Sequence, residues 1–229
     1  MIHYIVACHF GQRRYSISDD GSLILRKHLN VLSEMMQGIT RVTVVLNFDT
    51  EDDIYKAHEV VNDFSHLPLS LICRENRGYS YAAWDQAVRE SIEENEIEFY
   101  ALFEDDYVPS KPLFYNPFIE KFKNDDRIGY VCSMILDGPR HAAMSIGLLK
   151  KSVAKSLVER TGKVFDIVDE PGYVGAENTQ RTFLTNMELQ GYLFDEAGKE
   201  FCWPFCSFGE MIYAGNELGE ELITPIMEI

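Results

Sequence analysis

Short apolar runs alternate with helix-like segments through the first half of the sequence, and this alternation restricts the fold more than any other feature. Each run is rich in aliphatic, aromatic or β-branched residues, and the runs lie at 3–10, 41–48, 69–73 and 99–103. The segments between them place apolar residues three or four positions apart, as amphipathic helices do. Strands separated by helices pair in parallel through right-handed crossovers. The alternation therefore predicts an α/β fold with a mostly parallel central sheet flanked by helices.

The fourth strand-like run ends in three consecutive acids, Glu104, Asp105 and Asp106, and a proline follows at position 109. Adjacent carboxylates raise one another's pKa values unless a cation lies between them. Carboxylate oxygens are the ligands that Mg²⁺ and Mn²⁺ prefer. We interpret the three acids as a divalent cation site, and an acidic surface turn is the alternative.

Polar turns follow each of the four predicted strands. They comprise the basic loop Gly11–Arg14, the turn Asn47–Asp49, the turn Asn76–Gly78 and the three acids. In open parallel sheets, ligands bind outside the carboxyl ends of the strands. Because all four turns fall at that edge, the sequence predicts one binding site there.

Composition excludes several classes of function. The 229 residues carry a net charge of −16, which argues against nucleic acid as a main partner because phosphate binding needs a basic surface. No apolar run is as long as a membrane span, and the first residues do not form the core of a signal peptide. We expect a cytoplasmic protein, either free or peripheral to the membrane, with five reduced cysteines and one domain over 1–229.

The second half of the sequence is less regular. We expect a helix at 114–122, a strand at 128–136, a small apolar segment at 141–146, a helix that begins after Gly147 and buries Leu149, and a further helix at 177–189. The last segment, 192–229, mixes aromatic runs with glycine and proline and predicts no single element.

The order of these motifs resembles the GT-A-fold glycosyltransferases, most of all the large inverting family 2, over about residues 5–194. Segment 47–52 resembles that family's acidic turn after the second strand, which contacts the nucleotide base. Segment 76–82 is similar to its Asn-Gly turn, and 104–106 to its DxD motif, which holds a divalent ion on the donor diphosphate. Segment 142–151 resembles the region below the acceptor site. Segment 175–178, followed by a helix and Gly191-Tyr192, resembles the helix start that carries the catalytic base.

Two positions depart from the family pattern. Glu104 stands where an aspartate is usual, so we place the metal on Asp106, with Asp105 shared between the metal and the ribose. The usual Glu-Asp pair is Glu177-Asn178 here. Since an asparagine cannot accept a proton at neutral pH, the catalytic base would be Glu177.

The resemblance divides the chain into a nucleotide-binding part, about 1–109, and an acceptor-side part, about 110–229. Metal ligands are expected at Asp105 and Asp106, with Mn²⁺ or Mg²⁺ as the ion. The residues expected to bind the nucleotide-diphosphate donor are His9, Arg13, Asn47, Asp49, Asn76, Arg77, Gly78, Glu104 and Asp105.

The expected function is metal-dependent transfer of a sugar from a UDP, GDP or TDP donor to a hydroxyl acceptor, such as a glycan or polysaccharide intermediate. Inversion is favoured over retention. Two alternatives stay open. Asn178 leaves room for a catalytically silent GT-A-like module that binds sugar nucleotides. A sugar-nucleotide pyrophosphorylase fits less well, because Gly11 stands alone where such enzymes usually have a glycine-rich loop. The sequence does not specify the oligomeric state.

Overall fold

A computed structural model of the chain describes most of the first 165 residues and three later strands. The described residues are 1–11, 21–124, 128–132, 135–136, 141–142, 147–165, 200–205, 210–215 and 223–225. Within these ranges, no helix is both long enough and apolar enough to cross a membrane.

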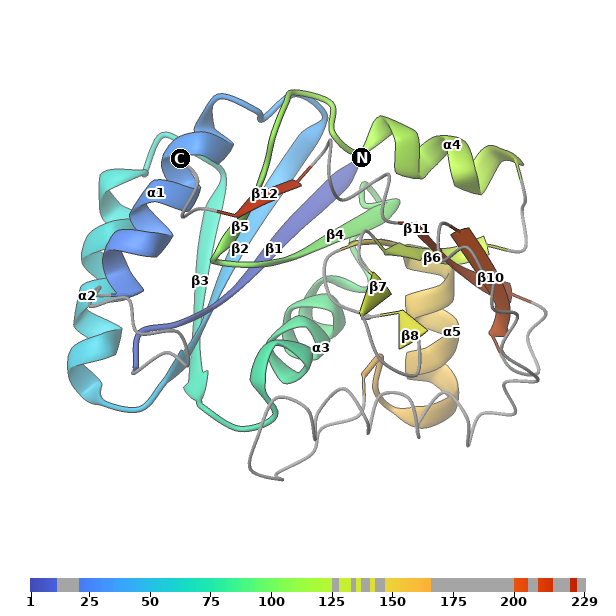
Figure 1. Ribbon diagram of the computed structural model, residues 1–229. Helices are drawn as coiled ribbons and strands as arrows, with labels where there is room; N and C mark the ends of the chain where they lie inside the picture. Colours follow the sequence, from blue (N-terminus) through green and yellow to red (C-terminus); the bar gives the residue numbers. More distant parts are fainter. Residues whose placement is uncertain are drawn as a thin grey trace.

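An eight-stranded sheet runs through the centre of the molecule (Figure 1). Its order is β10-β11-β6-β9-β4-β1-β2-β3. The strands span Ile2–His9 (β1), Ile39–Phe48 (β2), Leu69–Glu75 (β3), Phe99–Glu104 (β4), Ile128–Cys132 (β6), Gly147–Lys150 (β9), Glu200–Phe205 (β10) and Glu210–Gly215 (β11).

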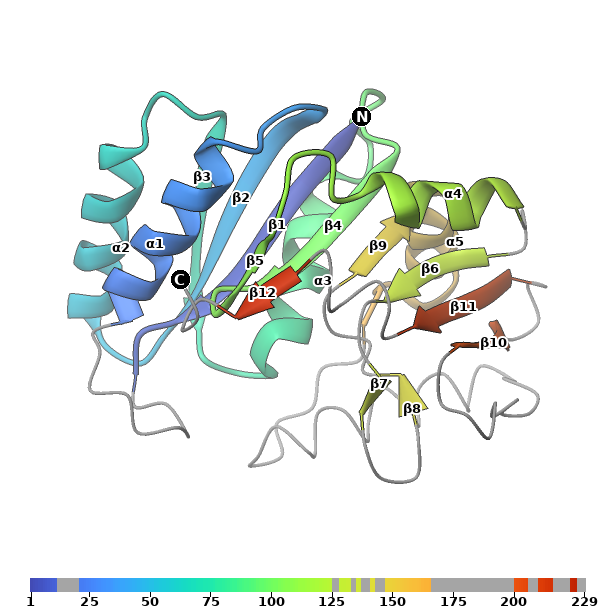
Figure 2. The same ribbon diagram turned by 45° about the horizontal axis from the view of Figure 1, so that its top comes forward.

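Most of the sheet is parallel. Strand β1 pairs in parallel with β2 and β4, β2 with β3, and β11 with β6. Strand β9 runs antiparallel between β4 and β6, and β10 runs antiparallel to β11. The order along the sheet can be followed in Figure 2. The α/β fold with a mostly parallel central sheet flanked by helices, as the resemblance to GT-A enzymes implied, is therefore confirmed.

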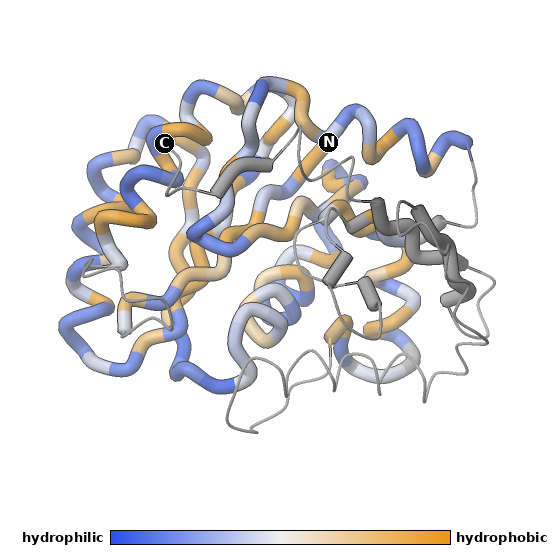
Figure 3. Tube along the Cα trace, in the orientation of Figure 1, coloured by the Kyte–Doolittle hydropathy of each residue, from blue (hydrophilic) through white to orange (hydrophobic). Residues whose placement is uncertain are grey.

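Helices cover both faces of the sheet. One apolar core lies beneath α1 (Gly21–Ser33), α2 (Glu51–Asp63) and α4 (Asn116–Asn124), and the opposite core lies beneath α3 (Tyr79–Ser91) and α5 (Lys151–Thr161). Strand residues alternate between these cores, as their period of two requires. Figure 3 shows the apolar residues concentrated along the inner strands.

The first three helices begin and end close to where the sequence places them. Thr50 caps α2 as expected, because its side chain accepts a hydrogen bond from the Asp53 backbone N–H while the Asp53 carboxylate accepts one from the Thr50 backbone. Trp84 is fully buried on the inner face of α3, and its indole N–H donates to the Phe103 carbonyl of β4 at 3.0 Å. Local signals thus determine these elements.

Two expectations in the second half are wrong in detail. Gly147–Lys150 forms strand β9 rather than the first turn of a helix, because Leu148 and Leu149 fill opposite cores between β4 and β6. The strand expected at 128–136 is two elements, β6 and β7 (Ile135–Leu136), and β7 pairs with β8 (His141–Ala142). The helix expected at 177–189 lies outside the described residues.

Pro109 is the last residue of a short further strand. Residues Tyr107–Pro109 form strand β5, which pairs antiparallel with β12 (Ile223–Pro225) in a separate two-stranded sheet. Such a peripheral pair accommodates prolines, which central strands do not. Strand β12 therefore lies beside the segment that directly follows the three acids.

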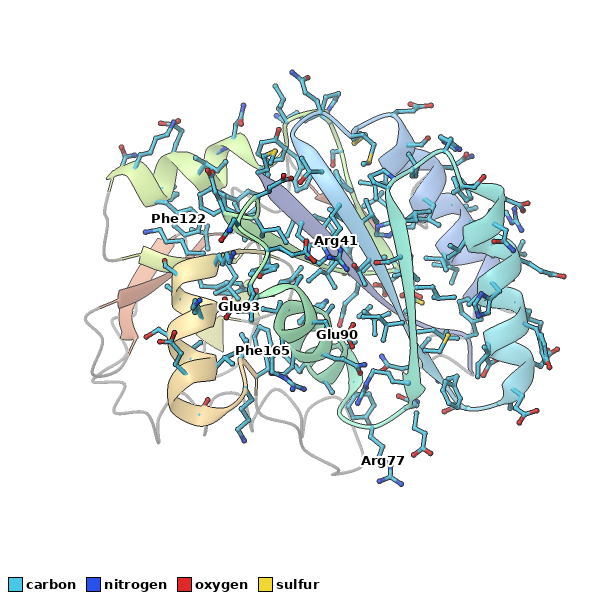
Figure 4. All side chains as sticks on the ribbon, turned by 180° about the vertical axis from the view of Figure 1, so that it is seen from behind. Arg41, Arg77, Glu90, Glu93, Phe122 and Phe165 are labelled. Atoms are coloured by element: carbon cyan, nitrogen blue, oxygen red, sulfur yellow. The ribbon has the colours of Figure 1, made fainter. Side chains whose placement is uncertain are left out.

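A buried carboxylate joins α3 to the chain after α5. Asp85 is fully buried, and its Oδ1 accepts hydrogen bonds from the backbone N–H groups of Val164 at 2.6 Å and Phe165 at 3.2 Å. Its Oδ2 accepts one from Arg89 Nε at 2.7 Å. Phe165, labelled in Figure 4, packs against Trp84 with ring centroids 6.0 Å apart. The carboxylate satisfies two backbone groups that the α3–α5 core would otherwise desolvate.

Another buried polar group lies near the start of β1. His3 is fully buried, with Nδ1 3.0 Å from Ser91 Oγ and Nε2 2.7 Å from Thr43 Oγ1. Burial, with the charge of Arg41 as a second cause, lowers the pKa of His3 from 6.5 to about 3. The ring is therefore neutral in the folded protein at any pH well above 3.

Acidification should destabilise the protein partly through His3. In the unfolded chain the ring has its ordinary pKa, so between about pH 6.5 and pH 3 the unfolded state binds more protons. The free energy of unfolding therefore falls as the pH is lowered through this window, by roughly 3 kcal/mol for this group at pH 4. Urea unfolding of wild type and of His3→Gln from pH 7 to pH 4 checks this. The variant should have the shallower pH dependence, and equal slopes would contradict it.

Candidate functional site

The carboxyl ends of the four parallel strands meet at one edge of the sheet. His9 of β1 is in register with Asn47 of β2, which is in register with Arg74 of β3, and Ala7 is in register with Glu104 of β4. The polar residues that follow these strands are thus brought to a common level. The sequence prediction of a shared edge holds for the described turns.

The acidic turn, Asp105-Asp106, connects β4 to β5. Hydrogen bonds from β1 and from α1 hold it in place. The Asp105 backbone N–H donates to the Ala7 carbonyl at 3.1 Å, and its Oδ2 accepts from the His9 backbone N–H at 3.3 Å. Its carbonyl oxygen lies 3.1 Å from Nδ1 of His28 on α1. Asp105 is only 5% exposed, and Oδ1 of Asp106 is also buried. The two carboxylates are therefore partly buried at fixed positions, unlike the side chains of an exposed surface turn.

The third acid points elsewhere. Glu104 Oε1 accepts a hydrogen bond from Ser80 Oγ of α3 at 2.6 Å. Because side chains alternate along β4, Glu104 faces α3, the same side as Leu102. The geometry separates Glu104 from the turn formed by Asp105 and Asp106.

Three predicted residues form one cluster beside this turn. Asp49 Oδ2 lies 2.7 Å from His9 Nε2, and Asp49 Oδ1 accepts from Asn76 Nδ2 at 3.0 Å. Asn76 Nδ2 is also 3.1 Å from His9 Nε2. Burial acts to raise the pKa of the Asp49 carboxyl, but the hydrogen bonds from His9 and Asn76 and the charge of His9 outweigh it, so the pKa is lowered. Asp49 is therefore an ionised acceptor at neutral pH.

Gly11 permits the close approach of this cluster to the backbone. A Cβ at position 11 would lie 2.4 Å from Asp49 Oδ2 and 2.6 Å from His9 Cε1. Both distances are too short, so any larger residue would displace the pair. Gly11 was expected only as part of the basic loop after the first strand, although a glycine directly after a buried strand is a signal of close backbone approach.

Arg74 is a second residue that the sequence analysis missed. Its Nη1 donates to Asn47 Oδ1 at 2.6 Å and to the Arg77 carbonyl at 2.8 Å. Asn47 Nδ2 in turn donates to the Tyr79 carbonyl at 3.4 Å. The sequence signal was a charged residue directly after the apolar run 69–73. In the structure Arg74 lies near the end of β3, in register with Asn47.

These hydrogen bonds support an unusual backbone before α3. Gly78 has φ 72° and Tyr79 has φ 52°, so two successive residues are left-handed. Glycine adopts this conformation freely, whereas a tyrosine there is strained by an amount on the order of 1 kcal/mol. Such strain persists only where surrounding contacts impose it. The Asn47 and Arg74 side chains supply those contacts.

Arg77 is not in the cluster. Its Nε lies 3.3 Å from Glu75 Oε2, and both side chains are about two-thirds exposed. Figure 4 shows the Arg77 side chain pointing away from the sheet edge. Arg13 and Glu177, the predicted phosphate contact and catalytic base, lie outside the described residues, as does Asn178.

Asp105 and Asp106 do not form an all-protein metal cage. Within the described part of the chain, no group of three or more His, Cys, Asp or Glu side chains could hold a metal ion. Carboxylate oxygens are ligands that Mg²⁺ accepts, and this ion usually keeps several waters or other ligands from outside the protein. The two carboxylates would therefore supply only part of the coordination shell of a divalent cation.

Comparisons with known proteins found similarity only at the level of structure. No protein-family model matches the sequence, and no curated protein matches it. The structure is similar to a mannosyltransferase from Pyrobaculum calidifontis in complex with GDP-Man and Mn²⁺, with a TM-score of 0.49 and 14% identity over 71% of this chain. The chain spans 46% of the length of that protein.

Two further solved structures have comparable scores. One is a 4-diphosphocytidyl-2C-methyl-D-erythritol synthase from Anaerococcus prevotii, with a TM-score of 0.48 and 11% identity over 80% of this chain and 82% of that one. The other is TarS from S. aureus, with a TM-score of 0.47 and 12% identity over 78% of this chain and 53% of that one. Identities and scores this low do not specify a function.

Proposed function

We propose that the chain is a metal-dependent glycosyltransferase of the GT-A type, in or near inverting family 2. It would move a sugar from a nucleotide-diphosphate donor to a hydroxyl of a glycan or polysaccharide intermediate. The observation that carries the proposal is the acidic turn, fixed at the carboxyl end of β4 beside the His9–Asp49–Asn76 cluster. Two carboxylates that would bind the donor diphosphate through a divalent cation, and a polar cluster on the neighbouring strands that would bind the nucleoside, support this proposal.

The residues at the edge divide the work of binding. Asp105 and Asp106 would hold the divalent cation, which neutralises the charge on the leaving diphosphate when it is bound. In a protein with a net charge of −16, that neutralisation matters because the surrounding field repels phosphate. The cluster of His9, Asp49 and Asn76 would hold the base and ribose, since it offers both donors and an ionised acceptor.

The transfer step needs a proton acceptor. The acceptor oxygen bonds to the anomeric carbon as the bond from that carbon to the diphosphate oxygen breaks, and the hydroxyl proton passes to a base. We assign this role to Glu177. A positioned carboxylate contributes about 10²–10⁴-fold to such a step. Attack from the face opposite the leaving group inverts the anomeric configuration.

A thermal-shift experiment tests donor binding. The melting temperature is measured with UDP, GDP or TDP, each with and without Mn²⁺. A further sample contains Mn²⁺ alone. One nucleotide with Mn²⁺ at 100 times its Kd should stabilise the protein by about 2.7 kcal/mol. For a chain of this size that raises Tm by roughly 5–11 °C. Mn²⁺ alone should give little shift, because two carboxylates bind it weakly without phosphate. No shift with any nucleotide would overturn the proposal.

Replacing the proposed base should separate binding from transfer. Glu177→Gln should keep the nucleotide and Mn²⁺ shift and lose about 10²–10⁴-fold in transfer rate. Product formation from a sugar nucleotide that gives a shift is measured directly, with Glu120→Gln on α4 as the matched surface control. Full activity in Glu177→Gln would exclude it as the base. If wild type binds but turns over no sugar nucleotide, the chain is a silent binding module.

A further inference from the structure

A buried histidine on α1 connects the core of the sheet to the acidic turn. His28 Nδ1 lies 3.1 Å from the Asp105 carbonyl oxygen, and Nε2 lies 2.9 Å from the Tyr4 hydroxyl of β1. A carbonyl can only accept, so Nδ1 carries the hydrogen. In the neutral ring Nε2 then accepts from Tyr4. The two partners therefore specify one tautomer.

The ring is fixed by packing as well as by hydrogen bonds. His28 is fully buried. Its ring is edge-on to Tyr4, with centroids 5.8 Å apart, and edge-on to Phe103, at 6.4 Å. Tyr4 and Phe103 stack on each other at 4.6 Å. Because Tyr4 belongs to β1 and Phe103 to β4, these contacts fix the position of the imidazole relative to both strands.

The contact controls a particular peptide. The Asp105 carbonyl belongs to the peptide bond that Asp105 shares with Asp106, and that unit is planar. On the other side, the Asp105 N–H is held by the Ala7 carbonyl. Fixing the direction of the Asp105 carbonyl therefore fixes the orientation of this peptide plane. The plane in turn sets the position of the Asp106 Cα, from which the Asp106 side chain projects.

We propose that His28 is a positioning residue that orients the Asp105-Asp106 peptide and so sets the affinity for a donor bound through Mn²⁺. The second part of this proposal rests on the proposed function, whereas the first part concerns the free protein. His28 touches neither the donor nor the metal. It acts by holding the peptide between the two carboxylates.

Two amide substitutions separate positioning from core filling. In His28→Asn the side-chain amide can stand where Nδ1 stands and donate to Asp105. In His28→Gln the longer side chain places its amide near the position of Nε2. Both variants remove the imidazole, so a role in packing alone predicts similar losses in both. A third variant, Tyr4→Phe, removes the other hydrogen bond and leaves the Asp105 contact.

The first measurement is the backbone amide NMR signal of Asp106 without nucleotide or metal. It should stay near its wild-type position in His28→Asn and move in His28→Gln. The second is nucleotide affinity with and without Mn²⁺. The Mn²⁺-dependent affinity should fall about 10–100-fold in His28→Gln, the range seen when groups that orient metal ligands are removed. It should change little in His28→Asn and Tyr4→Phe, and metal-independent affinity should be unchanged in all three.

Equal amide shifts in His28→Asn and His28→Gln would overturn the proposal, as would equal losses of Mn²⁺-dependent affinity. Should the variants fail to fold, ¹⁵N NMR of the wild-type imidazole decides, because a hydrogen on Nε2 instead of Nδ1 is incompatible with the contact to Asp105. If wild type binds no nucleotide, the proposed function fails, while the amide shifts still test the positioning role.

Discussion

Asp106→Asn should abolish the part of nucleotide binding that depends on Mn²⁺. Asparagine keeps the size of the side chain but removes the negative charge and one strong oxygen ligand, which a hard divalent cation needs. Since the site offers only two adjacent carboxylates in the described residues, losing one leaves too few ligands. We expect the entire metal-dependent shift in Tm, roughly 5–11 °C near saturation, to disappear. Thermal unfolding with nucleotide, with and without Mn²⁺, measures it.

The matched control is Asp63→Asn at the end of α2. Asp63 pairs with Arg26 on the surface, and α2 ends at the edge of the sheet opposite to the acidic turn. The control should keep the full metal-dependent shift. Retention of that shift in Asp106→Asn would exclude Asp106 as a metal ligand and leave Asp105 to be tested in the same way.

Asp85→Ala should strongly destabilise the α3–α5 core. The change leaves the backbone N–H groups of Val164 and Phe165 buried without their acceptor. Each buried group that loses its partner costs about 1–3 kcal/mol, so the free energy of unfolding should fall by about 2–6 kcal/mol. Urea unfolding monitored by circular dichroism measures the change.

Two companion variants show which contact of Asp85 matters. Asp85→Asn keeps an oxygen that can accept from both backbone groups, so it should lose clearly less than the alanine variant. Arg89→Gln removes the partly exposed cation but leaves both backbone donors on the buried carboxylate, so it should cost less than Asp85→Ala. If Arg89→Gln were as damaging as Asp85→Ala, the ion pair rather than the backbone contact would be the main interaction.

Local signals in the sequence were sufficient for the first half of the fold. Thr50 as a cap, the apolar face of α3 around Trp84 and the alternation of elements predicted β1 to β4 and α1 to α3 with small errors at the ends. They failed at Gly147–Lys150, where two leucines suit a helix or a strand equally and pairing with β4 and β6 decides. Long-range pairing of this kind leaves no local pattern.

The candidate site was predictable in part for the same reason. His9, Asp49 and Asn76 follow predicted strands, so the topology alone brings them together. Side-chain direction was not predictable from the same pattern. Glu104 bonds to Ser80 and Arg77 pairs with Glu75, and the expectation that these two residues contact the donor stays a prediction.

The roles of Arg74, Gly11 and His28 also depend on side-chain direction, which the sequence pattern does not specify. Arg74 reaches Asn47 and the turn before α3, and Gly11 leaves space beside Asp49. His28 belongs to α1, and its link to the Asp105 carbonyl depends on how α1 packs against β1 and β5, which the helical pattern does not contain.

The pairing of β5 with β12 has a consequence for the order in which the molecule folds. Strands β1, β2 and β3 are neighbours both in the sequence and in the sheet, so their contacts are more local than the contact of β5 with β12, and local contacts form quickly. Strand β12 is far from β5 in the sequence, so this contact requires closure of a long loop. We expect the edge that holds His9 and Asp49 to form early, and the strand beside the acidic turn to gain its partner only in a late step of folding.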